Sequence, residues 1–287
     1  MRSEPLFIEE ASISAAWAAA LCRVIDRGIE ALTPLVVSIT DFDDQQLPRE
    51  NIVARSALDR SLKLYGKGLS VETVAGTIFP HTFWRPGIPR DRLFARYRRM
   101  IPRLKKDLRN RNGLYFERLI AYGGAPADGN QLEYILQCYD RGVRRKPALQ
   151  ASLFDPTVDL PTQAAVFDAS RDLTMQPQRG FPCLQQVAFA PDYDHCTLSM
   201  SAFYASQYLY KRAYGNYLGL CHLGRFMANE MGLKLDRVTC YVGYAQLDDT
   251  PGKTKLRGLV TELRTVFPNA VPCSAPSLSI DEPNDHI

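Results

Sequence analysis

Apolar and polar residues along the chain follow two periods, one typical of helices and one typical of strands. Apolar side chains three and four residues apart predict helices, whereas compact or alternating apolar runs predict strands. The predicted helices are Ile13–Leu32, Ile52–Leu64, Arg92–Leu108, Asn130–Tyr139, Asn216–Met231 and Lys253–Val266. The predicted strands are Leu35–Ile39, Ala148–Phe154, Val187–Ala190, Thr197–Tyr204 and Val238–Leu247. Because the two kinds of element are mixed and no internal repeat is visible, the pattern predicts an α+β fold in a single domain.

Turn and loop signals place the boundaries within this domain. Val187–Ala190 and Thr197–Tyr204 flank a turn at Pro191–Asp194, so we expect them to pair as a hairpin. The segment Glu72–Pro89 is rich in proline and aromatic residues, and it is predicted to be a packed loop beside a site or an interface. We expect one domain over residues 1–267, followed by a proline-rich, acidic and mobile tail over residues 268–287.

Charge is distributed unevenly along the chain. The formal net charge of the 287 residues is only +4, which by itself names no polyanionic partner. Eleven of the residues from Arg85 to Arg111 are lysine or arginine, against two aspartates. A helix with its arginines toward solvent is the commoner explanation of such a run, so nucleic acid is not the partner that we expect. A nucleic-acid surface is the alternative, because aromatic residues such as Trp84 and Tyr97 lie among the arginines.

The positions of cysteine and histidine narrow the kinds of site that we expect in this protein. The seven cysteines show neither a C-x-x-C pair nor a recurring spacing, which argues against a zinc site and a disulfide framework. A reduced, cytoplasmic protein is the simplest interpretation, and the first ten residues lack the pattern of a secretion signal. No apolar run approaches the ~20 residues of a membrane span. The four histidines lack ligand spacing and no glycine-rich phosphate loop occurs, which disfavours metalloenzymes and nucleotide hydrolases.

One cysteine and one asparagine stand out as candidate chemistry. Cys183 follows Phe181-Pro182 and precedes the two predicted strands of the hairpin, and about thirty residues later Gly215-Asn216 opens a long helix. A thiol at the end of a strand can act as a nucleophile, and an amide in the first turn of a helix can hold a ring by hydrogen bonds, which together suit covalent chemistry on a pyrimidine. By residue type alone, Cys183 is more often a small buried hydrophobe and Asn216 a helix N-cap.

Residues 179–247 resemble the core of the thymidylate synthase family. Pro182-Cys183 matches the family's Pro-Cys-His motif around its nucleophile, with Leu184 in place of the histidine. The stretch Tyr204–Tyr208 aligns with its Gln-Arg-Ser-x-Asp motif, and Asn216 aligns without a gap with its pyrimidine-reading asparagine.

Weaker matches extend the resemblance into the first half of the chain. Trp17–Glu30 matches the family's first helix, and Val71-Glu72 matches its active-site glutamate. Gly113–Phe116 matches its Gly-x-x-Tyr-Gly turn. Asn130–Leu132, followed by Arg144-Arg145, matches its later helix and paired arginines. The resemblance therefore spans roughly the whole chain, and it is most specific after Arg179.

The resemblance implies a fold, a reaction and partners. It implies a single thymidylate synthase-like domain with a central mixed sheet, flanking helices, and a sheet face that packs against a second copy in a homodimer. It implies transfer of one carbon from 5,10-methylenetetrahydrofolate to C5 of a uracil-like ring. Cys183 would be the nucleophile, Asn216 the ring reader and Glu72 a proton relay through water. The implied substrate contacts are Tyr115, Arg144, Arg145, Ser206 and Gln246, with the paired arginines supplied by the partner subunit in the family.

Departures from the family pattern change the expected substrate. Ala205 stands where the family has a phosphate-binding arginine, which removes a charge-assisted bidentate contact. Tyr208 replaces an aspartate, and Gln246 and Asp248 replace the residues that hold the sugar hydroxyl, with Asp248 expected to repel a phosphate. We therefore expect methyl or hydroxymethyl transfer to a related acceptor rather than ordinary dUMP methylation. The alternative is a catalytically silent member of the same fold that acts as a binding or scaffold protein.

Overall fold

A mixed β-sheet forms the centre of the computed structural model, which describes residues 3–66, 69–107, 110, 113–123, 127–143, 145–155, 159, 182–248 and 251–268. Within these residues the sheet has six strands in the order β1-β2-β6-β5-β4-β3. They are β1 (Ser3–Glu10), β2 (Ala31–Ile39), β3 (Gln150–Ser152), β4 (Leu184–Asp192), β5 (Thr197–Tyr208) and β6 (Lys234–Gln246). The pairs β1-β2 and β5-β6 are parallel and the other pairs are antiparallel, which confirms the predicted α+β class and mixed sheet.

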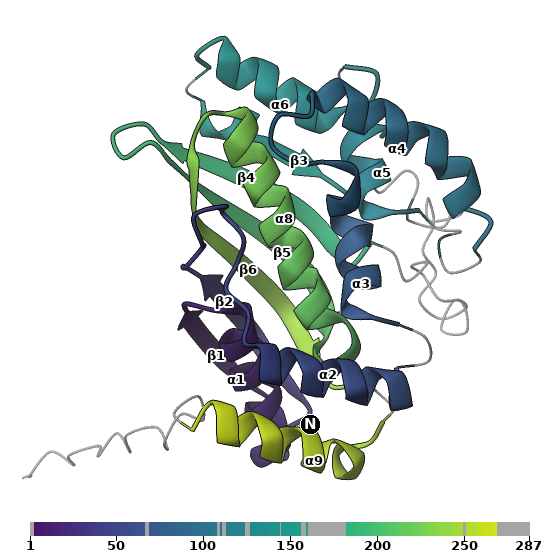
Figure 1. Ribbon diagram of the computed structural model, residues 1–287, viewed down its shortest axis with the longest axis vertical. Helices are drawn as coiled ribbons and strands as arrows, with labels where there is room; N and C mark the ends of the chain where they lie inside the picture. The colour runs from purple at the N-terminus through teal and green to yellow at the C-terminus, as the bar shows by residue number, and fades with distance from the viewer. Residues whose placement is uncertain are drawn as a thin grey trace, which may run out of the picture.

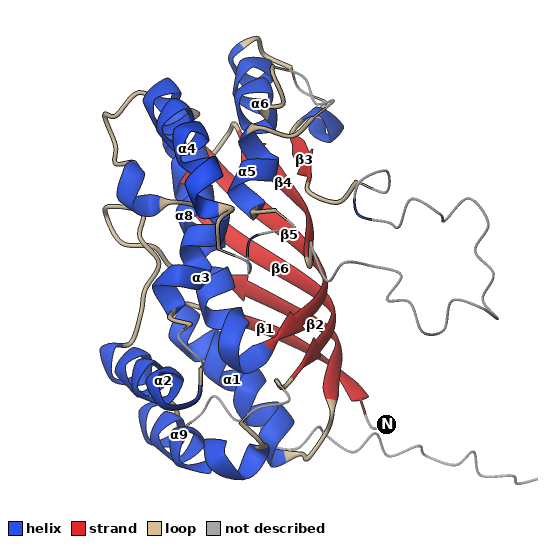
Figure 2. Cartoon of the chain, turned by 90° about the vertical axis from the view of Figure 1, so that its right-hand side faces the viewer, coloured by secondary structure: helices blue, strands red, loops and turns tan. Residues whose placement is uncertain are grey.

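The helices gather on one face of this sheet (Figures 1 and 2). They are α1 (Ile13–Asp26), α2 (Ile52–Tyr65), α3 (Val71–Ile78), α4 (Arg90–Leu104), α5 (Tyr115–Ile120), α6 (Gln131–Asp140), α8 (Tyr214–Glu230) and α9 (Lys253–Val266). Shorter helical turns are η1 (His81–Phe83), η3 (Lys146–Ala148) and the π-helical turn η5 (Leu209–Ala213). Among the described residues, no helix is long and apolar enough to cross a membrane.

The long helix α8 crosses the sheet and anchors the other helices. Its side chains are buried almost from end to end, because it lies between the sheet and α3. Two glycines permit the contact with α3: a Cβ on Gly215 would lie 2.6 Å from the Cβ of Val74, and one on Gly219 would lie 2.7 Å from the carbonyl oxygen of Ala75. This close packing fixes α3 beside the first turn of α8.

Most predicted elements are confirmed, with shifted ends. The helices at α2, α6 and α9 and the hairpin of β4 and β5 lie where the pattern placed them. The predicted helix Arg92–Leu108 spans Arg90–Leu104, and the predicted strand Ala148–Phe154 shortens to Gln150–Ser152 after the turn η3. The predicted tail lies outside the described residues, apart from Pro268.

Three predictions near the N-terminal half were wrong. The helix predicted to reach Leu32 ends at Asp26, because Gly28 has a positive φ of 63° and the chain enters β2 at Ala31. Strand β1 was missed because only Leu6 and Ile8 face the core, which is too short an alternation to detect. The loop predicted over Glu72–Pro89 contains α3 and η1. A helix as short as α3 depends on tertiary packing, in this case on α8.

Candidate functional site

A cavity of about 900 Å³ lies among the ends of β5 and β6, the first turn of α8, and helices α3, α4 and α5. Six of the eight residues predicted from the sequence line it: Glu72, Tyr115, Cys183, Ser206, Asn216 and Gln246. Of the two predicted arginines, Arg145 is exposed and is not part of this lining, and Arg144 lies outside the described residues. Segments far apart in the chain therefore meet at one cavity.

Cys183 is held at the entrance to β4, next to β5. Its carbonyl oxygen accepts a hydrogen bond from the backbone N–H of Ala205 at 3.0 Å, which continues the hairpin ladder by one residue. Its Sγ lies 3.9 Å from the hydroxyl of Ser206, where either group can donate. The cysteine is free and half-buried, so the thiol is supported by a polar neighbour and still reaches the cavity.

Two phenols flank this thiol. Burial raises the pKa of Tyr115, with Cys183 adding to the effect, while backbone groups at Leu184 and Cys183 and the charge of Arg212 act in the opposite direction. Burial likewise raises the pKa of Tyr204, whose hydroxyl is buried without a hydrogen-bond partner among the described residues. Both phenols are therefore protonated at neutral pH.

Asn216 presents an unused amide to the cavity. It is the third residue of α8 and 5% exposed, and its side chain makes no hydrogen bond to the described part of the chain. The alternative N-cap role is wrong, because α8 continues from the turn η5 and its N-cap is Ala213. Its amide atoms are not among the buried polar atoms without a partner, so they open to the cavity, where a ligand or water can complete their hydrogen bonds.

A second amide on the cavity wall was missed by sequence analysis. Gln207 is 3% exposed, accepts a hydrogen bond from the Tyr217 hydroxyl at 3.1 Å, and leaves its Nε2 without a partner among the described residues. The alternation of β5 gave no signal for it, because the strand changes phase after Tyr204. Gln207 is buried and Tyr208 exposed, the reverse of what regular alternation predicts.

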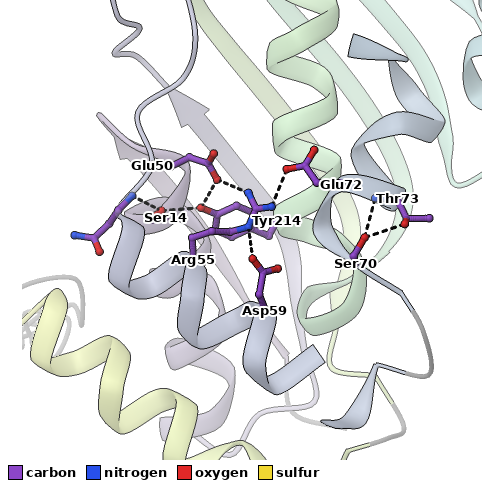
Figure 3. A network of polar contacts seen from close by, with 9 residues as sticks. Ser14, Glu50, Arg55, Asp59, Ser70, Glu72, Thr73 and Tyr214 are labelled. Carbon is purple, nitrogen blue, oxygen red and sulfur yellow. Dashed lines mark hydrogen bonds and ion pairs between the residues drawn. The ribbon is translucent and has the colours of Figure 1, made fainter. Parts of the chain in front are cut away.

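Glu72 is tethered at the cavity by an ion-pair network (Figure 3). Arg55 Nη2 donates to Glu72 Oε1 at 2.8 Å, and the same guanidinium contacts Glu50 at 2.8 Å and Asp59 at 3.0 Å. Burial would lower the pKa of Arg55, but its bonds to the carboxylates of Glu72 and Glu50 outweigh burial and raise it. The carboxylate of Glu72 is thus oriented by a permanent positive charge.

A stacked pair of histidines adjoins this carboxylate. His81 lines the cavity, its Nε2 lies 3.6 Å from Glu72 Oε2, and its ring stacks on His222 with centroids 4.7 Å apart. Burial, followed by repulsion from the charge of His81, lowers the pKa of His222 to about 4. His222 is therefore neutral at physiological pH. Neither histidine stood out from the sequence, because their sequence spacing follows no ligand pattern.

Arg212 supplies a positive charge on the same wall. It belongs to η5, two residues before α8 begins at Tyr214, and forms no ion pair with the described residues. The sequence contained one signal for it, since Arg212 precedes Asn216 by four residues and so falls one helical turn away. An unpaired guanidinium at a cavity wall can bind an anionic group bidentately.

Asp248 does not face the cavity, so the predicted repulsion of a phosphate was wrong. Its buried carboxylate accepts hydrogen bonds from the backbone N–H groups of Tyr210 at 3.2 Å and Lys211 at 3.1 Å. Its Oδ1 also lies 3.6 Å from Lys211 Nζ. Burial raises the pKa of Asp248, and the bonds to Lys211 partly offset this. Asp248 therefore satisfies free N–H groups of η5 and holds the turn that carries Arg212.

No family model matches the chain, and no curated protein matches it. Among the described residues, no group of three or more histidine, cysteine, aspartate or glutamate side chains could hold a metal ion. What the cavity binds must therefore follow from its walls. Among the described residues these walls offer a thiol, neutral donors and acceptors at Asn216 and Gln207, a permanent positive charge at Arg212, and the carboxylates of Glu72 and Asp107.

Proposed function

We propose that the protein is a one-carbon transferase that attaches a methyl or hydroxymethyl group to C5 of a uracil-like ring through a covalent bond to Cys183. The observation that carries this proposal is the convergence of Glu72, Cys183 and Asn216 on one cavity. Their segments lie far apart in the sequence, and the resemblance to thymidylate synthases assigns all three to a single site.

In this proposal Cys183 forms the covalent bond to the ring and Asn216 binds the ring by hydrogen bonds. The Cys183 thiolate adds to C6, forming an S–C bond and moving the C5–C6 electron pair toward C5 and the O4 oxygen as an enolate. The Asn216 side chain can accept a hydrogen bond from N3–H and donate one to O4. The hydrogen bond to O4 strengthens as negative charge develops on that oxygen. After C5 has gained its new carbon, loss of the C5 proton and cleavage of the bond between that carbon and the folate nitrogen leave an exocyclic methylene group on the ring. Water then adds to this group to give a hydroxymethyl product, or a hydride that the folate would supply on its oxidation to dihydrofolate gives a methyl product. Cleavage of the S–C bond in the same step restores the ring and releases Cys183.

The cavity fits a flat donor beside the acceptor ring. Its volume of about 900 Å³ lies at the upper end of the usual range for small-molecule pockets, and its outer walls include Leu69, Phe83 and Tyr97. These residues would hold the donor by stacking and apolar contact. When bound, 5,10-methylenetetrahydrofolate supplies the one-carbon unit.

Charged residues complete the proposed site. Glu72, oriented by Arg55, passes the C5 proton to solvent through water. Arg212 binds an anionic group of the acceptor, because Ala205 is exposed and lacks the arginine of the family at this position. Arg144 and Arg145 act from the partner subunit of a homodimer, as they do in the family.

A catalytically silent binding protein is the second candidate. Two departures from the family favour it: Leu184, in place of the histidine after the nucleophile, is completely buried, and Tyr208, in place of the aspartate, is 41% exposed. A protein of this kind would bind a ring at Asn216 without forming a bond to Cys183.

Covalent trapping distinguishes the two candidates. The full chain is incubated with 5-fluorouracil nucleosides and nucleotides and 5,10-methylenetetrahydrofolate, and intact-protein mass spectrometry measures the adduct. We expect an adduct in the wild type and none in Cys183→Ser, whereas Cys196→Ser, which changes an exposed cysteine away from the cavity, retains it. If the nucleosides or nucleotides bind but none of them forms a Cys183-dependent adduct, the transferase is rejected and the catalytically silent binding protein is retained.

A further inference from the structure

Four arginines form a stripe along the solvent side of α4. Arg92, Arg96, Arg99 and Arg103 follow the spacing i, i+4, i+7 and i+11, which places them on one line along the helix. All four are exposed, and the opposite side of α4 is buried through Leu93, Phe94 and Tyr97. With a rise of ~1.5 Å per residue, the stripe extends over about 16 Å.

Three of the four arginines of this stripe have no charge partner among the residues that the structure describes. Arg92, Arg99 and Arg103 form no side-chain hydrogen bond or ion pair with the described residues. Other cations of the region are paired, such as Arg90 with Glu133 at 2.8 Å. The charge run by itself favours a solvated helix, but a solvated helix needs neither this alignment nor arginine at all four positions. Arginine is the residue that binds phosphate bidentately.

The arginine stripe adjoins the cavity. The Arg96 guanidinium carbon lies 4.2 Å from the ring centroid of Phe83, and Phe83 lines the cavity together with Tyr97 and Leu104 of α4. Phe83 is half-buried. A cation stacked on a partly exposed aromatic ring, beside a row of arginines without partners in the described part of the chain, is a combination that can bind a phosphate backbone and a base at once. The other class of anionic partner, a membrane surface, fits less well, because the apolar side of α4 is already buried in the core.

We propose that the arginine stripe of α4 binds the phosphate backbone of a single-stranded nucleic acid. The stripe does not depend on the chemistry at Cys183. A second step rests on the proposed function: a pyrimidine base of the bound strand enters the cavity past Phe83, so that the acceptor is a base within a polynucleotide. The phosphates are then held outside the cavity, where the arginines are.

Fluorescence anisotropy with the full chain tests the surface. The probes are labelled oligo-dT and oligo-U strands about twelve nucleotides long, titrated from about 50 mM to about 300 mM salt. Four neutralised phosphates give a slope of log K against log salt of about −3, and Arg99→Gln with Arg103→Gln halves the slope and weakens binding about tenfold or more. The charge-matched control is Arg27→Gln with Arg257→Gln, at exposed arginines near α9, the end of the molecule opposite α4, and it binds like the wild type (Figure 1).

Other outcomes overturn the proposal. They are no binding at the lowest salt, equal weakening by both double variants, and binding to vesicles of mixed phosphatidylserine and phosphatidylcholine in place of the strands. The chemical step is scored separately with a strand that carries one 5-fluorouracil. A Cys183-dependent adduct with free nucleotides but no strand binding rejects the arginine surface and keeps the proposed function. Strand binding without any adduct rejects the proposed function and keeps the surface.

Discussion

The amide of Asn216 is the residue through which the cavity can select its ligand. The residue is 5% exposed, and neither its side-chain N–H donors nor its side-chain oxygen makes a hydrogen bond to the described residues. In Gln207, by contrast, the side-chain oxygen already accepts a hydrogen bond from the Tyr217 hydroxyl. A carboxylate at this position could only accept hydrogen bonds at neutral pH, which suits the exocyclic amine of cytosine and not the O4 of uracil. Selection between the two rings therefore depends on one side chain.

We predict that Asn216→Asp reverses the ring preference. The variant should lose about 5- to 30-fold in adduct formation with 5-fluorouracil nucleosides, which corresponds to ~1–2 kcal/mol for one hydrogen bond left unmade, and gain with 5-fluorocytosine nucleosides. Adduct rates measured by mass spectrometry on both rings check this. Asn216→Ala is the matched control, because it should weaken both rings without preferring either. An unchanged ratio in the aspartate variant would remove Asn216 as the ring reader.

His222 gives the folded state a pH dependence. Its pKa is lowered from 6.5 to about 4 by burial and by the neighbouring His81, with Glu72 acting in the opposite direction and Arg225 in the same one. The unfolded chain takes up this proton near pH 6.5, so it binds more protons than the folded chain below that pH. The stabilising contribution is therefore complete above about pH 6.5 and is lost as the pH falls toward 4.

We predict that stability falls between about pH 6.5 and pH 4 by up to about 3 kcal/mol from this group alone. Urea unfolding at several pH values measures the free energy of unfolding. In His222→Phe the ring stack can persist without a titrating group, so the pH dependence should be shallower than in the wild type. Parallel curves for the two proteins would contradict a buried neutral histidine at this position.

At the scale of elements, the contact between α3 and α8 positions the cavity wall. Gly215 and Gly219 let the two helices approach so closely that Glu72 on α3 and Asn216 on α8 line one cavity. A methyl group at Gly215 would meet the Cβ of Val74 at 2.6 Å and the carbonyl oxygen of Val71 at 2.8 Å, which the helices can relieve only by separating.

We predict that Gly215→Ala destabilises the protein by about 1–3 kcal/mol and weakens ligand binding at the same time. The midpoint of urea unfolding measures the first effect and the trapping assay the second. Gly258→Ala in α9 is the matched control, because no atom lies within 4 Å of its added methyl group. It should instead stabilise by up to ~1 kcal/mol through higher helix propensity. Equal effects of the two variants would mean that the glycine contact does not determine the packing.

At the scale of the whole molecule, one face of the sheet is not covered by helices (Figure 2). On that face lies a row of apolar residues that are exposed or, at Val36, half-buried. Phe7, Val36, Tyr241 and Phe203 are register neighbours across β1, β2, β6 and β5. Phe7 is 70% exposed, and the rings of Phe203 and Tyr241 stack with centroids 5.5 Å apart. Such a row on an open sheet is unusual for a surface that faces only water.

We predict that this face forms the homodimer implied by the resemblance. Light scattering coupled to size-exclusion chromatography should give a dimer for the wild type and a monomer for Tyr241→Lys combined with Phe203→Lys. Leu64→Lys is the control, because Leu64 is 74% exposed on α2, in the helical layer, and should leave the dimer intact. A monomeric wild type would reject the interface, and with it the supply of Arg144 and Arg145 by a partner subunit.

The candidate site could be predicted in part from the sequence. Cys183 and Asn216 were found because each lies in a short local motif, and the structure brings both to one cavity. Gln207 was missed because β5 changes phase after Tyr204, and regular alternation cannot reveal such a change. Asp248 was misread because its partners are backbone N–H groups of η5, which a list of side chains does not show.

The sequence by itself determined the local elements, since burial on one face leaves a period in the order of apolar residues. It thereby determined α2, α6, α9 and the hairpin of β4 and β5, and its motifs singled out the thiol and the amide. Only the tertiary structure decided which residues share the cavity, because the approach of α3 to α8 depends on contacts between residues more than one hundred positions apart. It also decided that Arg212 lines the cavity, and that Arg92, Arg99 and Arg103 of α4 lie near it without a charge partner among the described residues.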